Sequence, residues 1–165
     1  DVTALVNRLS GAAPVTCGSP IATSDWEVLT YGDAAGLLDA TKRAVTRCIG
    51  LGFKRSMIAV VTFRGRDGSA LLPYDALGPH AFRRFTGEYD LLGSPRYTSG
   101  DIALETVFRF KGQSAPAVVF TEIDFETLDE GAMRRLFVGA TRASMKLVLV
   151  MSERAARALI ERIDA

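Results

Sequence analysis

The sequence predicts an α/β domain in which helices cover both faces of a mainly parallel β-sheet. Apolar segments of strand length alternate along the chain with segments whose apolar residues repeat at helical spacing. The best strand candidates, residues 57–63 and 145–151, are continuous apolar runs, which is typical of strands covered on both faces. A chain of 165 residues, 48% of them hydrophobic, is long enough for one domain with a buried core. We therefore expect residues 1–165 to form a single domain.

The first third of the chain predicts a strand, a helix and a second strand. Residues 1–21 are expected to be a peripheral helix end and loop. The stretch WEVLTY, residues 26–31, alternates and carries β-branched and aromatic residues, so it predicts a strand. Asp33 is placed to cap a helix that ends at Gly52. The buried face of that helix is predicted to be Leu37, Thr41, Val45 and Ile49. The strand 57–63 follows.

The middle of the chain, residues 64–100, is rich in Gly and Pro and predicts mostly irregular structure. Within it we expect only a short helix near 69–77 and a short strand near 83–86. Two further strands, 102–107 and 117–123, are predicted on either side of a loop.

The last third predicts a helix, a strand and a final helix. Thr127 and Glu130 fit the S/T-x-x-E capping box and predict a helix start. The expected buried residues of this helix are Met133, Leu136, Phe137 and Ala140. After the strand 145–151, Ser152 is placed to cap a helix. The expected inner face of that helix is Ala155, Leu159, Ile160 and Ile163.

Composition excludes several classes of protein. Lys and Arg number 20 against 19 Asp and Glu, so net charge alone points to no polyanionic partner. No apolar run approaches the roughly 18 residues of a membrane span. The chain begins with Asp and shows no leader, so we expect a cytoplasmic fragment of a longer protein. Cys17 and Cys48 form no CxxC pair and are interpreted as reduced thiols. His80, the single histidine, gives little support for Ser-His or Cys-His catalysis.

Basic residues stand beside glycines where two predicted strands end. Arg64 and Arg66 follow the strand 57–63, and Arg109 and Lys111 follow the strand 102–107. Glycine allows close approach of the backbone to an anion, and Arg or Lys neutralises it, so both loops carry phosphate-binding chemistry. For either loop taken alone, an ordinary solvated loop is the favoured interpretation. Residues 42–66 contain seven Lys or Arg and no carboxylate, which adds a local positive charge.

The stretch EIDFETLDE, residues 122–130, has the opposite charge. Glu122 and Asp124 are two residues apart, so on a strand they would share a face and could hold a metal or act in acid–base catalysis. The favoured interpretation is that the stretch supplies negative charge to a helix N-terminus. The chain has no GxxxxGK[ST] and no GxGxxG after a strand. Any nucleotide would therefore be held from one side, with another domain supplying the phosphate loop.

Two stretches resemble signature blocks of the UvrD/Rep/PcrA-like superfamily 1 DNA helicases. TVFRFKGQSAPAVVF, residues 106–120, is similar to motif V, a T-x-H-x-x-K-G-x-E pattern before a strand. RRLFVGATRASMKLVLV, residues 134–150, is similar to motif VI, a V-A/G-x-T-R-A pattern before a strand. MIAVVTFRGRDGS, residues 57–69, resembles motif IV more loosely. The resemblance covers roughly residues 55–165 and implies the second, C-terminal RecA-like domain of the helicase motor.

The resemblance implies roles for individual residues. ATP with Mg²⁺ would be held mainly by an absent N-terminal RecA-like domain. Arg142 matches the motif VI arginine and Arg64 the motif IV arginine, both of which contact the γ-phosphate in the family. The motif V match assigns Gly112 and Ser114 to the nucleotide. It assigns the contact with single-stranded DNA to Thr106, Phe108, Arg109 and Lys111.

Two positions depart from the family pattern. Phe108 stands where the family has a DNA-contacting His, and Ser114 where a Glu meets the ribose. Phe108 could stack on a base or belong to the core, and Ser114 can hydrogen-bond without bringing charge. An alternative is therefore a degenerate RecA-like domain that serves as a nucleic-acid or protein interaction module. A self-contained enzyme of another doubly wound type would need a complete phosphate loop, which these residues lack.

Overall fold

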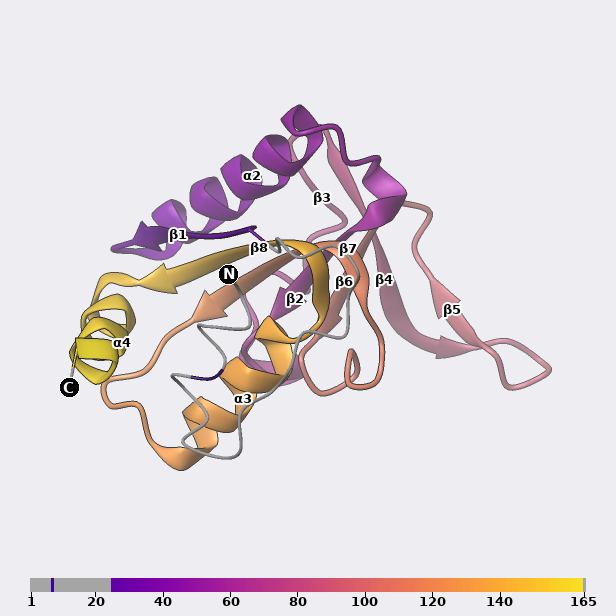
Figure 1. Cartoon of the computed structure of the whole chain (residues 1–165). Coiled ribbons are helices and arrows are strands. Elements are labelled where there is room, and N and C mark those ends of the chain that lie inside the picture. The colour runs from indigo at the N-terminus through magenta and orange to yellow at the C-terminus, as the bar shows by residue number, and fades with distance from the viewer. Residues whose placement is uncertain (1–6, 8–24, 165) are drawn as a thin grey trace.

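The computed structural model describes residue 7 and residues 25–164 (Figure 1). The segment 1–21, predicted to be peripheral, lies outside the described residues apart from position 7. The described chain forms an eight-stranded sheet with the order β1-β8-β7-β2-β6-β4-β3, and β5 pairs with β4 beside this path. The five contacts from β1 to β4 in this order are parallel, and β3 and β5 run antiparallel to β4. The predicted α/β class with a mainly parallel sheet is confirmed.

The first helix forms as the sequence predicts. Strand β1, Asp25–Tyr31, leads to helix α2, Ala34–Gly50. The Asp33 carboxylate accepts a hydrogen bond from the backbone N–H of Gly36 at 2.7 Å, which satisfies one free donor of the first turn. Leu37, Thr41 and Val45 are buried, as expected.

The centre of the sheet consists of four parallel strands. They are β2, Ile58–Thr62; β6, Ile102–Thr106; β7, Ala115–Ile123; and β8, Ala143–Ser152. All five residues of β2 are buried, and so are the last seven of both β7 and β8. This burial agrees with their continuous apolar sequences.

The two C-terminal helices require two corrections. Helix α3, Glu130–Ala140, is capped by Asp129, whose carboxylate accepts from Ala132 N–H at 2.7 Å, and not by Thr127. Thr and Asp can both cap a helix, and here the cap is Asp129, which directly precedes the first helical residue, Glu130. Helix α4, Glu153–Asp164, is capped by Ser152 as predicted, but Ile160 is 57% exposed and lies off its inner face.

The segment 66–100 contains more strand than the sequence predicts. The expected helix near 69–77 is absent from the described chain; a single 3-10 turn, Arg66–Gly68, and strand β3, Ala76–Leu77, occupy this region. Strand β4, His80–Tyr89, is much longer than the expected 83–86 and forms a hairpin with β5, Pro95–Tyr97. Figure 1 shows this hairpin extending away from the rest of the domain.

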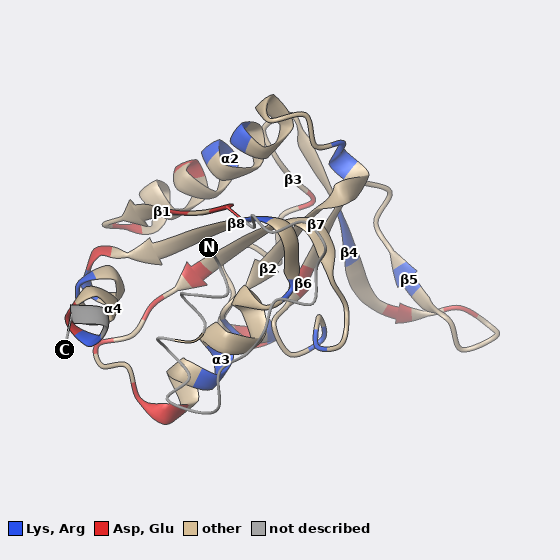
Figure 2. Cartoon of the chain, viewed as in Figure 1, with Lys and Arg blue, Asp and Glu red and all other residues tan. Residues whose placement is uncertain are grey.

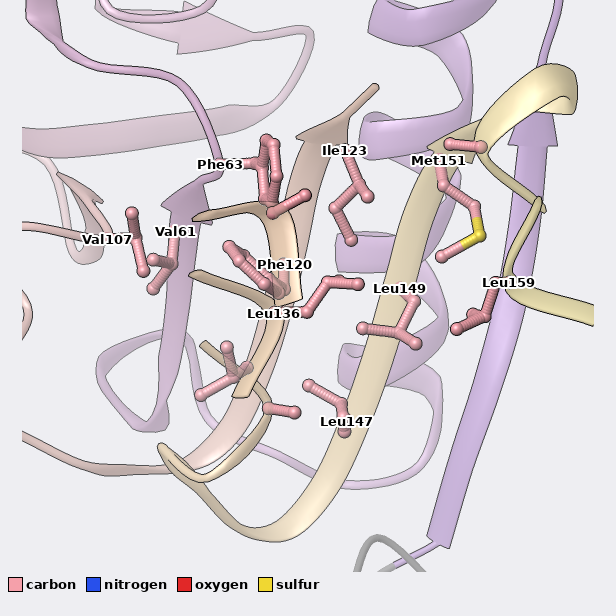
Figure 3. Packing of buried hydrophobic residues seen from close by; sticks show 14 of the residues in the cluster. Val61, Phe63, Val107, Phe120, Ile123, Leu136, Leu147, Leu149, Met151 and Leu159 are labelled. Atoms are coloured by element: carbon pink, nitrogen blue, oxygen red, sulfur yellow. The ribbon is translucent and has the colours of Figure 1, made fainter. Parts of the chain in front are cut away.

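Two hydrophobic clusters cover the two faces of the sheet. Helix α2 packs on one face through Leu37, Ala44 and Cys48. Helices α3 and α4 pack on the other, where Leu136 and Leu159 meet the alternate residues of β2, β7 and β8 (Figure 3). The helices on both faces complete the three layers expected of this fold class.

Candidate functional site

The parallel strands give the sheet two chemically distinct edges. Thr62 of β2 is level with Thr106 of β6 and Thr121 of β7, so their carboxyl ends share one edge. We call it the carboxyl edge. Ala115 and Ala143 pair at the start of β7 and β8 and mark the opposite, amino edge. The nine residues of β7, at about 3.3 Å each, separate the edges by roughly 25 Å.

Arg142 lies at the amino edge, between the end of α3 and the start of β8. Its guanidinium donates through Nε to Val138 O at 3.0 Å, through Nη2 to Thr141 Oγ1 at 3.0 Å, and through Nη1 to Gln113 O at 3.3 Å. Gln113 belongs to the loop 107–114, so this loop and the arginine share one rim. The residue is half-buried and therefore open to solvent on one side.

Two other residues predicted for the nucleotide, Gly112 and Ser114, lie on the same rim. Gly112 and Ser114 are exposed, as is Lys111 beside them. Gly112 has a φ of 83°, in the left-handed region that favours glycine. The backbone N–H of Ala115 donates to Arg142 O at 3.0 Å, which joins the loop to the arginine. The structure therefore brings Arg142, Gly112 and Ser114 together.

Arg64 lies at the carboxyl edge, away from Arg142. Its Nη2 is 3.0 Å from Asp124 Oδ2, and Arg154 and Ser152 donate to the same carboxylate. The hydrogen bond from Arg154 is the main cause that lowers the pKa of Asp124 to about 2. Given the separation of the edges, one phosphate group cannot meet Arg64 and Arg142 together in this arrangement.

Three of the residues predicted to contact DNA lie around a cavity at the carboxyl edge. Its volume is about 250 Å³, and it opens where β6 ends beside β4. Thr106 is buried there and accepts from Arg109 N–H, whereas Phe108 is 60% exposed. Lys111 does not line this cavity. Figure 2 shows basic residues, all of them arginines, on the neighbouring strands β4 and β5.

Sequence reasoning missed the contribution of β4 to this cavity. Phe85 of β4 forms part of its wall, and the guanidinium carbons of Arg109 and Arg66 lie 4.1 and 5.2 Å from the Phe85 ring centroid. Glu105 also lines the cavity and pairs with Arg109 Nε at 3.3 Å. The first residues of β4 alternate between buried and exposed, which is a strand pattern. The polar residues and the Gly that follow in the sequence hide this pattern.

The carboxylates of the acidic stretch do not form a common site. Glu122 is fully buried with a φ of 59°, and its two oxygens accept from Ser69 Oγ at 2.5 Å and Ala70 N–H at 2.6 Å. Burial raises the pKa of Glu122. Asp129 caps α3 and Glu130 lies in its first turn, so the stretch supplies negative charge to a helix N-terminus as favoured, although Glu122 and Asp124 take no part in it. No group of three metal-ligating side chains occurs among the residues that the structure describes.

The surroundings of His80 and Cys48 indicate structural roles for both residues. The His80 ring lies 2.9 Å from Thr46 Oγ1 and 3.1 Å from Arg55 Nη1, and its burial lowers its pKa. Cys48 is a buried free thiol whose pKa burial raises to about 11, so it is not poised to react. Cys17 lies outside the described residues.

The fold is a mixed α/β domain with a mostly parallel sheet, consistent with a RecA-like domain, and comparisons with known proteins point to helicase C-terminal domains. Residues 101–150 match the family model of the UvrD-like helicase C-terminal domain. This region contains β6, the loop 107–114, β7, α3 and most of β8. The recognition made from motifs V and VI is confirmed, and the chain has the signature of a helicase C-terminal domain.

A solved structure supports the same fold. The C-terminal domain of a possible DNA helicase from Lactobacillus plantarum WCFS1 is similar over 95% of this chain and 89% of that one, with a TM-score of 0.67 and 16% identity. No curated protein matches the chain. In the part of the chain that the structure describes, no helix is long and apolar enough to cross a membrane.

Proposed function

We propose that the chain is the C-terminal motor domain of an ATP-dependent DNA helicase or translocase. In this proposal the amino edge faces ATP and Mg²⁺ held mainly by an N-terminal RecA-like domain of the same protein. The carboxyl edge holds single-stranded DNA. The chain lacks half of such a site and is therefore inactive by itself.

The observation that carries the proposal is the path of the loop 107–114. The loop begins beside Thr106 at the carboxyl edge and reaches Gln113, a partner of Arg142, at the amino edge. Val107 and Phe110 are buried between these points in the cluster under α3 and α4. A single short segment thus joins the DNA cavity to the nucleotide rim, which is the connection a motor requires.

Arg142 is proposed to act as an arginine finger. A guanidinium has five N–H donors, and three polar contacts hold this one at the rim. Donors remain for a phosphate oxygen, and the fixed position suits charge stabilisation during hydrolysis. The exposed hydroxyl of Ser114 and the backbone at Gly112 would meet the nucleotide from the same side. Arg64 pairs with Asp124 at the DNA edge, so we assign it no phosphate contact.

The test is Arg142→Ala in the full-length protein. We expect ATP binding to be nearly unchanged and turnover to fall by about 10³–10⁵, as for other arginine fingers. The matched control is Arg134→Ala on α3, an exposed residue whose ion-pair partner within the described ranges is Glu130. ATP hydrolysis in a steady-state assay and nucleotide binding by fluorescence separate the two effects. Turnover close to that of the control would contradict the assignment.

A second function is favoured by one observation: three donors of Arg142 already serve its own domain. A domain that kept this arginine for structure alone would be a degenerate module that binds nucleic acid or protein. Translation of the upstream gene decides between the two, because an intact GxxxxGK[ST] motif favours the motor and its loss favours the module.

A further inference from the structure

The cavity at the carboxyl edge has the dimensions and walls of a site for one planar ring. Its volume of about 250 Å³ is below the range of about 300–1,000 Å³ typical of drug-sized ligands. Leu72, Leu104, Phe85 and Phe108 supply apolar surface. Phe108 is 60% exposed, so an aromatic face is available for stacking. Stacking of a base on such a ring contributes about 1–3 kcal/mol in other single-strand binders.

The rim of the cavity carries positive charge that carboxylates do not fully neutralise. Arg84 is paired with Asp75 at 2.7 Å. Arg66 is exposed, and within the described ranges it pairs with no carboxylate. A backbone phosphate on either side of a bound base could contact Arg66 or Arg109, whose guanidinium groups flank Phe85.

Glu105 is the unexpected member of this cavity. A carboxylate repels phosphate, and non-specific binding of a strand gains nothing from one. Its side chain is only 13% exposed and pairs with Arg109 Nε at 3.3 Å. Burial raises the pKa of Glu105, and the charge of Arg109 opposes that rise. A carboxylate accepts at two oxygens, so Glu105 keeps capacity for a donor on a ligand in the cavity.

We propose that the cavity holds one base of the bound single strand and that Glu105 accepts a hydrogen bond from the exocyclic amino group of that base. The inference rests on the proposed function, because the strand delivers the base. It adds a base preference that a motor with backbone contacts alone would lack. The preferred pyrimidine is cytosine, and thymine is disfavoured.

The chemistry of the two pyrimidines sets the direction of this preference. Cytosine presents the N4 amino group as a donor, and Glu or Asp is its usual acceptor in proteins. Thymine presents the O4 oxygen at the same position, so two acceptors would face each other and no hydrogen bond to the base would form. One hydrogen bond of ordinary net strength, about 1–1.4 kcal/mol in a cavity that is partly open to solvent, corresponds to roughly a fivefold to tenfold difference in Kd.

The test is a fluorescence-anisotropy titration of the chain with labelled deoxycytidylate and deoxythymidylate oligonucleotides of equal length, at neutral pH and low salt. We expect roughly fivefold to tenfold tighter binding of the cytosine strand. Glu105→Gln should abolish that ratio, because an amide can donate to O4 as well as accept from N4. Both strands will bind this variant more tightly because a negative charge is lost. This gain is the same for both strands, so the ratio of their Kd values does not contain it.

The matched control is Glu88→Gln on the neighbouring strand β4, where the exposed carboxylate pairs with Arg96 outside the cavity. It removes the same charge and should leave the ratio as it is. Equal binding of both strands by the unaltered chain would overturn the base preference and leave the proposed function standing. Failure to bind either strand would overturn both. If Glu105→Gln is folded by circular dichroism and keeps the same ratio of Kd values for the two strands, Glu105 does not cause the base preference.

Discussion

Gly139, in the last turn of α3, gives the sharpest prediction about how the fold holds the rim that carries Arg142. A Cβ atom at this position would lie 2.2 Å from Phe120 Cε1 and 2.3 Å from Cζ. Phe120 is fully buried in the middle of β7, and its ring packs against Phe63 with 6.0 Å between centroids (Figure 3). The ring has no free space to move into, so Gly139→Ala must displace the helix or the sheet.

The effect of Gly139→Ala on the free energy of unfolding is the difference between a gain in helix propensity and a cost of overpacking. Alanine is better than glycine in a helix interior by up to about 1 kcal/mol, which would stabilise the variant. Overpacking of a filled core costs typically about 1–3 kcal/mol, and overlap this deep belongs at the upper end or beyond. We therefore expect Gly139→Ala to lower the free energy of unfolding by about 2 kcal/mol, measured by urea denaturation of the chain.

Gly50→Ala provides the matched control. Gly50 is the last residue of α2, and nothing lies within 4 Å of an added Cβ. The same substitution should there be neutral or slightly stabilising. Since Arg142 N–H donates to Gly139 O at 3.2 Å, displacement of the helix should also disturb the guanidinium. If Gly139→Ala is as stable as Gly50→Ala, α3 does not require this close contact and our reasoning about the rim fails.

Two further predictions concern the carboxyl edge and the loop. The pKa of Asp124 falls from 3.8 to about 2 in the folded chain, so its contribution to stability is complete above about pH 4 and is lost as pH falls toward 2. That shift corresponds to at most about 2.5 kcal/mol, and solvent around the half-exposed Arg154 reduces this value. Acid denaturation of Asp124→Asn should lack this part of the pH dependence, and an identical acid profile would contradict the assignment. Phe110→Leu should loosen the middle of the loop 107–114, so we expect the full-length protein to lose much of its DNA-stimulated ATP hydrolysis while its DNA-independent hydrolysis remains. An unchanged ratio of stimulated to unstimulated rate would argue against coupling through this loop.

The sequence predicts the buried strands well because burial on both faces demands continuous apolar residues. The four central strands and α2 appear within one or two residues of their expected bounds at most ends. The segment 66–100 was harder to predict, because β4 carries Arg83, Arg84 and Thr86 and is shaped by pairing with β5 and β6. Its pairing with β5 shifts register between Phe85 and Tyr89, around Gly87 with a φ of 93°. A strand with such an irregularity does not show the regular alternation of apolar and polar residues by which strands are predicted from sequence.

The candidate site shows a similar limit. Motif order identified Arg142 and its loop, and both lie on one rim as expected. The pairing of Arg64 with Arg142 at one phosphate neglected strand direction: Arg64 follows its strand, whereas Arg142 precedes its own. In a parallel sheet those positions lie at opposite edges. The cavity residues Phe85 and Glu105 come from neighbouring strands, β4 and β6, and only the register of the sheet brings them together.

The loop 107–114 explains why one short segment can serve two distant edges. From Thr106 to Ala115 the chain must return across the sheet, because β6 and β7 both run parallel to β2. A helix normally makes such a crossover, but here the segment is too short for one and instead buries Val107 and Phe110 against the sheet. In the proposed motor, its two ends would therefore not move independently: displacement of Phe108 by DNA would pull on a chain anchored at Phe110, and Gln113 O contacts Arg142 further along the same loop. A longer, helical crossover would absorb that displacement, so the shortness of the loop is what makes communication between the edges mechanically direct.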